Sequence, residues 1–301
     1  MILTVYLTNE VLNMKNIAQV IIALLIALNS PSKSFAQIHE QADSLLWEVS
    51  GNGLKHNSYL TGTLHIMCEK DFGILPKVEK AIKSSGQLYL EINFNDPKEM
   101  QAMQSMVLTE TLLTETLSAE QQDKLSHALK DTMGLSIQQV NQYSMTALLS
   151  MMMVKAVECP DMKFLDMELS TLAVNEGKTV KALETVEEQA QFFAKAYSND
   201  LILEYFQHYD SYKEMFADMV EIFKAEDLNS LMEAMQDPRF SNDDVRHWLL
   251  KVRNENWIVK MPKIMREDST VFAVGAAHLG GEFGVIKLLQ DAGYSVKPVM
   301  N

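Results

Sequence analysis

Strand-like segments at both ends of the chain, separated by a long helical stretch, are the feature that most constrains the fold. Short apolar runs bounded by Gly, Asn and Ser predict strands at 46–50, 59–64, 88–93, 270–274 and 294–299. Helical patterns lie between them at 75–84 and 284–291. Because both ends supply strands, the sequence predicts an α/β protein with one mixed sheet built from the N- and C-terminal segments.

The middle of the chain has helical spacing. Its start signals are capping-box pairs at Ser118 and Gln121, Ser136 and Gln139, and Thr185 and Glu188. One strand near 179–184 interrupts the helices. The predicted domains are therefore an α/β core, 37–96 and 262–301, and a mainly helical insertion, 97–261, which caps the core and contributes that strand.

The N-terminus has the pattern of a secretory signal. Lys15 precedes an apolar stretch, 17–28, that is too short to span a bilayer, and Ser34-Phe-Ala36 is a small-x-small cleavage site. We expect a signal peptide 1–36 with an upstream extension, 1–13, and cleavage after Ala36; the alternative is an uncleaved anchor. The mature protein would be exported to a periplasmic or extracellular location, with no transmembrane span.

Charge and cysteine content narrow the function further. A formal net charge of −14 leaves no basic face for a phosphate backbone, so nucleic acid is not an expected partner. Cys68 and Cys159 are the two cysteines, and an exported compartment is oxidising enough for them to pair. Two buried free thiols are the alternative.

Two Gly-x-x-His segments carry the chemistry: Gly62–His65 and Gly275–His278. Each follows an apolar strand. Glycine lets the backbone turn and approach a ligand closely, and the histidine lies at the carboxyl edge of the strand, where open α/β sheets bind ligands. Two such segments in the same local context predict one common site.

Glu91 is the third candidate, because it interrupts an apolar strand at 88–93. A buried carboxylate requires a cation or several hydrogen-bond donors. With His65 and His278 it would form a divalent-metal site with positions open to water. The structural alternative is that each histidine only packs and that Glu91 pairs with Arg253.

The chain contains no Gly-x-Ser-x-Gly elbow, no phosphate-binding loop and no His-Glu-x-x-His motif. Its own motifs resemble those of the TraB/GumN family, which is similar to the TIKI metalloproteases and more distantly to erythromycin-esterase-like and ChaN-like proteins. The matching segments are Thr61-Gly-Thr-Leu-His65, Leu90-Glu-Ile92, Ala182-Leu-Glu-Thr185, Glu188-Gln189, Arg253-Asn254 and Val274-Gly-Ala-Ala-His-Leu-Gly-Gly281.

This resemblance implies an α/β core with a helical insertion and, for the TIKI branch, a peptidase that uses manganese or cobalt, with zinc as a further candidate. Carried over by motif, the metal-binding or catalytic residues are His65, Glu91 and His278. Glu184, Arg253 and Asn254 would support them, beside Gly62 and Gly275.

The leading hypothesis is an exported metal-dependent hydrolase, a TIKI-like peptidase with a peptide or protein substrate. His65, Glu91 and His278 would bind the ion, and Arg253 would stabilise negative charge or hold Glu91. One alternative is an esterase-like, metal-independent hydrolase with a histidine as general base. Another is a non-catalytic binder of haem, metal or an apolar peptide, with Met-rich helices as its groove. The sequence leaves the oligomeric state open.

Overall fold

A computed structural model describes residues 43–300. The predicted signal peptide 1–36, its cleavage after Ala36 and the extension 1–13 lie outside the described residues. Within 43–300, no helix combines the length and the hydropathy that a membrane span requires.

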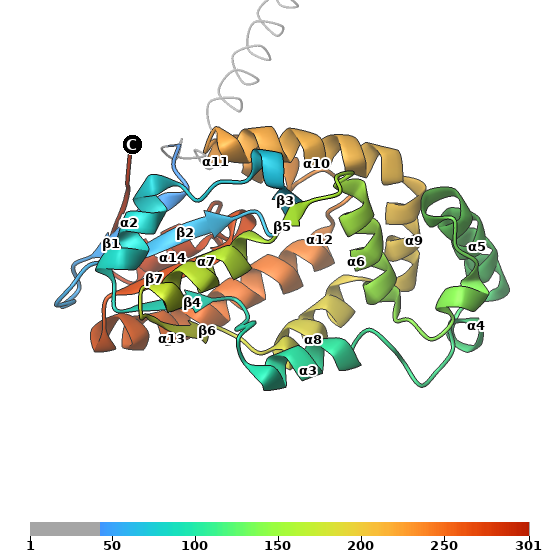
Figure 1. Cartoon of the computed structure of the whole chain (residues 1–301), viewed down its shortest axis with the longest axis horizontal. Helices are drawn as coiled ribbons and strands as arrows, with labels where there is room; N and C mark the ends of the chain where they lie inside the picture. Colours follow the sequence, from blue (N-terminus) through green and yellow to red (C-terminus); the bar gives the residue numbers. More distant parts are fainter. Residues whose placement is uncertain (1–42, 301) are drawn as a thin grey trace, which may run out of the picture. The chain divides into compact units, whose positions relative to one another are not determined.

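A six-stranded mixed sheet forms the core, in the order β6-β4-β7-β2-β1-β8. Its strands are β1 (Leu46–Ser50), β2 (Ser58–Thr63), β4 (Gln87–Leu90), β6 (Thr179–Ala182), β7 (Thr270–Gly275) and β8 (Ser295–Pro298). The neighbours β6, β4, β7 and β2 are parallel, and β1 runs antiparallel to both β2 and β8. The predicted α/β class, with one sheet drawn from both ends of the chain, is confirmed (Figure 1).

Helices account for most of the remaining chain. They are α2 (Pro76–Ser84), α3 (Pro97–Ser105), α4 (Leu113–Thr116), α5 (Ala119–Met133), α6 (Met145–Ala156), α7 (Leu165–Asn175), α8 (Val186–Ala196), α9 (Asn199–Gln207), α10 (Tyr209–Lys224), α11 (Leu228–Ala234), α12 (Asp243–Val245), α13 (Val252–Glu267) and α14 (Val285–Asp291). Short 3-10 turns lie at Glu69–Asp71, Ile137–Val140 and Ala276–His278, and a π-helical turn, Arg246–Lys251, leads into α13.

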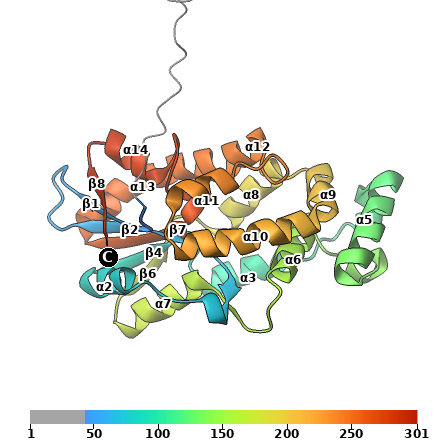
Figure 2. The ribbon, with the colours of Figure 1, turned by 90° about the horizontal axis from the view of Figure 1, so that it is seen from above.

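Both faces of the central strands of the sheet are buried, whereas the edge strands β6 and β8 are partly exposed. Alternate residues of β7 face opposite sides: Val271 and Ala273 belong to one apolar core, and Phe272 and Val274 to the other. Helices α2 and α7 supply the first core, while α13 and α14 supply the second (Figure 2). Burial on both sides explains why the strands read as nearly continuous apolar runs.

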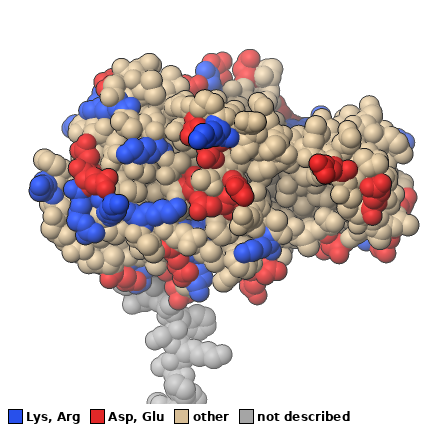
Figure 3. Space-filling view, turned by 90° about the horizontal axis from the view of Figure 1, so that it is seen from below, with Lys and Arg blue, Asp and Glu red and all other residues tan. Residues whose placement is uncertain are grey.

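Several of the helices between β4 and β7 form a second region beside the sheet. Helices α5, α6, α9 and α10 pack against one another there (Figure 1). The predicted capping boxes are present at Ser118, Ser136 and Thr185. On the face shown in Figure 3, lysines and arginines gather over the sheet together with acidic side chains, whereas acidic side chains predominate over the helical end.

A small second sheet pairs β3 (Met67–Cys68) with β5 (Met162–Lys163). Cys68 and Cys159 form a disulfide beside it, with their Cα atoms 5.9 Å apart. The structure therefore supports the predicted pair rather than two free thiols. The two cysteines are 91 positions apart in the sequence, so the cross-link closes a long loop. Such a link stabilises the protein chiefly by restricting the unfolded chain.

Gly62 has a packing role. It lies inside β2, and a Cβ added there would come within 2.9 Å of Leu279 Cδ1 and 3.1 Å of Ala276 Cα. The first Gly-x-x-His segment thus lets the turn after β7 lie directly against β2. The glycine provides space here, and no left-handed backbone is involved.

We therefore expect Gly62→Ala to lower the free energy of unfolding by about 1–3 kcal/mol through overpacking. Gly73 is a matched control, because a Cβ there would meet no atom within 4 Å. Urea denaturation of both variants measures the difference. Equal stability of Gly62→Ala and Gly73→Ala would contradict the packing role.

Candidate functional site

The candidate residues meet at the carboxyl edge of the parallel strands. His65 follows β2, Glu91 follows β4, Glu184 follows β6, and His278 ends the turn after β7. β4 ends at Leu90, so the predicted strand 88–93 is too long at this end. Glu91 consequently lies just beyond the carboxyl end of β4 rather than within a strand. This edge is where an α/β sheet presents its ligand-binding groups.

Arg253 joins the two glutamates. Its Nη2 donates to Glu91 Oε2 and to Glu184 Oε1, each at 2.5 Å, and its Nε donates to Glu184 Oε1 at 2.9 Å. All three side chains are about 95% buried. Since a buried charge is strongly unfavourable without a partner, this triad accounts for the placement of all three groups. The structural alternative for Glu91, an ion pair with Arg253, is thus present.

Neighbouring groups complete the buried network. The amide of Gly275 donates to Glu91 Oε1 at 2.7 Å, and Trp257 Nε1 donates to Glu184 Oε2 at 3.2 Å. Gln189 Nε2 donates to Glu184 Oε1 at 3.1 Å. Burial by itself raises the pKa of Glu91, but the charge of Arg253 and the Gly275 amide hold it well below the usual range. Glu91 is therefore ionised.

His278 is buried and neutral. Asn254 Nδ2 donates to the carbonyls of His278 and Phe283, so its Oδ1 is free to accept from His278 Nδ1 at 2.6 Å. Nε2 of the same ring then carries no proton and accepts from Arg253 Nη1 at 3.1 Å. Burial and the adjacent Arg253 charge lower the pKa of His278 to about 3. Its ring orientation is fixed on both sides.

His65 differs from the other site residues because it reaches solvent. Its side chain is 59% exposed, whereas those of Glu91 and His278 are 7% and 5% exposed. Its Nδ1 lies 2.8 Å from Asp166 Oδ2, and Thr63 Oγ1 donates to Asp166 Oδ1 at 3.1 Å. Asp166 is in the first turn of α7, where the helix dipole favours a carboxylate.

The proton balance of His65 follows from these neighbours. Partial desolvation of the ring lowers its pKa, but the Asp166 carboxylate, with a smaller contribution from Glu91, raises it to about 9. His65 therefore carries a positive charge at neutral pH. Its Nδ1 proton is directed to Asp166, so Nε2 can donate its own proton to a substrate or a water molecule in the charged form and can accept a proton in the neutral form.

Gly275 keeps a small space open next to this imidazole. A Cβ at that position would lie 3.2 Å from His65 Nε2 and 3.4 Å from Glu91 Oε1. Both atoms therefore face the same space beside Gly275. The two Gly-x-x-His segments lie close together, and the missing side chain of Gly275 leaves room between His65 and Glu91.

The predicted metal-binding set does not fit the side chains as they lie. His278 Nε2 is engaged by Arg253, and Glu91 is bound by Arg253 and by the Gly275 amide. Across residues 43–300, no group of three or more His, Cys, Asp or Glu side chains is arranged to hold a metal ion. Arg253 supplies the positive charge at the position where the sequence predicted a cation.

Three residues of the site were missed in the sequence: Asp166, Gln189 as a donor, and Trp257. Asp166 had a detectable signal. It shares the buried face of α7 with Leu169, Ser170 and Ala173, and an acid at a buried helical position needs a polar partner. Its partner, His65, is 101 residues away in sequence, so the sequence alone could not predict which residue Asp166 binds.

The fold and the site define an α/β protein with a solvent-exposed histidine paired with a buried aspartate, beside a buried glutamate–arginine network. The chain belongs to the TraB/PrgY/gumN family, whose family model matches residues 45–298. It is similar to a zebrafish (Danio rerio) protein named Metalloprotease TIKI2, at 23% identity over 316 aligned positions. The alignment covers 85% of this chain but 61% of that relative. No solved structure matches the chain significantly.

His65 and His278 should titrate in widely separated pH ranges. We expect His65 to lose its proton at a pH of about 9 and His278 to remain neutral down to about 3. Raising the pH from 7 to 10 should therefore change the ring signals of His65 and leave those of His278 unchanged. NMR of histidine-labelled protein measures both titrations.

Asp166→Asn is the control for this titration, because it removes the carboxylate that raises the pKa of His65. In this variant the His65 transition should move toward its ordinary value of about 6.5. An unchanged transition would show that Asp166 does not set the charge of His65.

Proposed function

We propose that this protein is a hydrolase that cleaves a peptide-like carbonyl substrate, with His65 as its general base. The observation that carries the proposal is the geometry of this residue: an exposed imidazole, fixed through Nδ1 by a buried aspartate, with Nε2 free. Such a pair is a recurring device for moving a proton during acyl transfer. The similarity to a protein named Metalloprotease TIKI2 supports the same reaction class.

In this mechanism His65 activates water. Its neutral form, which is favoured above a pH of about 9, accepts a proton from a water molecule at Nε2 as that water attacks the carbonyl carbon. Asp166 holds the Nδ1 proton and stabilises the imidazolium that forms. The imidazolium then returns the proton to the leaving group.

The buried network has a positioning role in this proposal. Arg253 contacts both Glu91 and Glu184, so each of these buried side chains has a cationic partner at the carboxyl edge of the sheet. Glu91 Oε1 faces the same space as His65 Nε2 and raises the pKa of that ring. His278, which bonds Arg253 and Asn254, keeps the guanidinium in place.

A metal-dependent reaction is the second candidate function. Asp166 and Glu91 produce a negative potential at His65, and a field that favours a proton there also favours a divalent cation. The manganese, cobalt or zinc ion expected from the sequence, and its binding by His65, Glu91 and His278, belong to this candidate. It requires Arg253 to move away from both His278 and Glu91.

Export is a further part of the proposal. The Cys68–Cys159 disulfide is favoured in an oxidising compartment. A periplasmic or extracellular location and a peptide or protein substrate agree with that chemistry. We propose no nucleic-acid partner, in keeping with the net charge of −14.

A peptide library cleaved by purified protein tests the function. His65→Ala should lower kcat/KM by at least about 100-fold, the usual contribution of a general base. His127→Ala is the matched control, because His127 is exposed on α5, bonds the carbonyl of Asp123 and lies outside the site. Equal loss in both variants, or no loss in His65→Ala, would contradict the role of His65.

Chelation in the same assay separates the two candidates. Activity that survives exhaustive chelation, in protein shown by elemental analysis to be free of metal, supports proton transfer by His65. Activity that disappears and returns with manganese, cobalt or zinc supports the metal-dependent reaction instead.

A further inference from the structure

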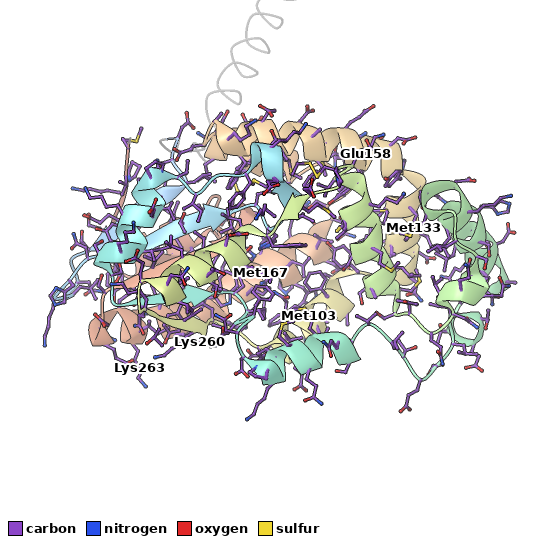
Figure 4. All side chains as sticks on the ribbon, viewed as in Figure 1. Met103, Met133, Glu158, Met167, Lys260 and Lys263 are labelled. Carbon is purple, nitrogen blue, oxygen red and sulfur yellow. A yellow bond between two sulfur atoms is a disulfide. The ribbon has the colours of Figure 1, made fainter. Side chains whose placement is uncertain are left out.

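The Cys68–Cys159 disulfide joins the two chain segments that carry His65 and Asp166. Cys68 is three residues after His65, and Cys159 is seven residues before Asp166. In Figure 4, Glu158, the neighbour of Cys159, lies near the end of α6, and Met167, the neighbour of Asp166, lies on α7. The cross-link is therefore placed between the helical region and the segment that leads to the site.

Several contacts besides the disulfide hold these two segments side by side, among them an ion pair between Lys163 Nζ and Glu69 Oε1 at 3.7 Å. The sheet between β3 and β5 has two residue pairs, Met67 with Lys163 and Cys68 with Met162. Two backbone hydrogen bonds extend it, from Glu69 to Asp161 at 2.9 Å and from Leu165 to His65 at 3.2 Å. A two-stranded sheet of this length is marginal by itself in water.

The last of these bonds leads directly into the site. The amide of Leu165 begins α7 and donates to the carbonyl of His65, and the next residue, Asp166, binds the ring of His65. The small sheet of β3 and β5 thus lies directly beside the point at which the imidazole and the carboxylate meet. A shift of about 1 Å in such a pair is enough to lower a rate about 100-fold.

We infer that the Cys68–Cys159 disulfide positions the His65–Asp166 pair, so that reducing it lowers the activity of a protein that is still folded. This inference rests on the proposed function of His65. Both cysteines are partly exposed, so a small dithiol can reach them. In the reaction the dithiol gives two electrons and two protons, the S–S bond breaks into two thiols, and the dithiol forms its own disulfide.

The central experiment compares oxidised wild type, wild type reduced with a dithiol, and the variant Cys68→Ser/Cys159→Ser. We expect reduction to lower the kcat of wild type by about tenfold or more, with a smaller change in KM. The serine variant should have the lower kcat already and should not respond to the dithiol. Far-ultraviolet circular dichroism verifies that each sample is folded.

Leu129→Ala is the matched control for general loss of stability. Leu129 is fully buried on α5, in the helical region. Its truncation therefore destabilises the protein without changing a residue of β3 or β5. This variant should keep its kcat and should still lose activity on reduction. If Leu129→Ala loses kcat to the same extent as the serine variant, the positioning role is overturned.

A readout without substrate separates this inference from the proposed function. NMR of histidine-labelled protein should show the Nδ1 proton of His65 protected by Asp166 in oxidised wild type, and Asp166→Asn identifies that signal. The signal should weaken in the serine variant. If it persists unchanged, the inference is wrong even where the peptidase assay succeeds; if the assay finds no cleavage but the signal weakens, the proposed function fails and the positioning role stands.

Discussion

The ion-pair network of Arg253 with Glu91 and Glu184 is the interaction on which the site depends. Two carboxylates at the end of neighbouring strands are buried together, and this arrangement is stable only with a cation between them. The guanidinium also donates to His278 and to the carbonyl of Leu249, so its planar shape binds four groups at once. The network therefore determines the orientation of the buried side chains of Glu91, Glu184 and His278.

The fold supplies this network from distant parts of the sequence. Four parallel strands bring their carboxyl ends to one edge, and α13, which covers one face of the sheet, presents Arg253 and Asn254 at that edge. The tight approach of the turn after β7 to β2 depends on Gly62. The close packing at Gly62 and the ion pairs of Arg253 thus both lie at the carboxyl edge of the sheet. Of the two histidines in this site, only His65 extends to solvent.

Much of this arrangement could be predicted from the sequence. The strands followed from apolar runs, the helix starts from capping boxes, and the convergence of His65 and His278 from two matching Gly-x-x-His segments. The strand end at Leu90 was not predicted, because Ile92 continues the apolar pattern and a run of residues does not show where hydrogen bonding stops. Local pattern therefore located the site but not its exact edge.

The partners within the site were the part that sequence could not supply. Arg253 was recognised both as a catalytic candidate and as a partner for Glu91, and spacing alone could not decide between these roles. Asp166 was missed because a single acid on a helix has no motif, and its hydrogen bond to His65 exists only after the chain has folded. Choosing between a metal ion and a guanidinium at Glu91 likewise needs coordinates.

The free energy of unfolding of Arg253→Met tests the central claim most directly. Because the change leaves two buried carboxylates without their cation, we predict a loss of about 3–5 kcal/mol in urea denaturation. The triple variant Arg253→Met, Glu91→Gln, Glu184→Gln, which removes the carboxylate charges as well, should regain part of that loss. Wild-type stability in Arg253→Met, or no recovery in the triple variant, would contradict the account.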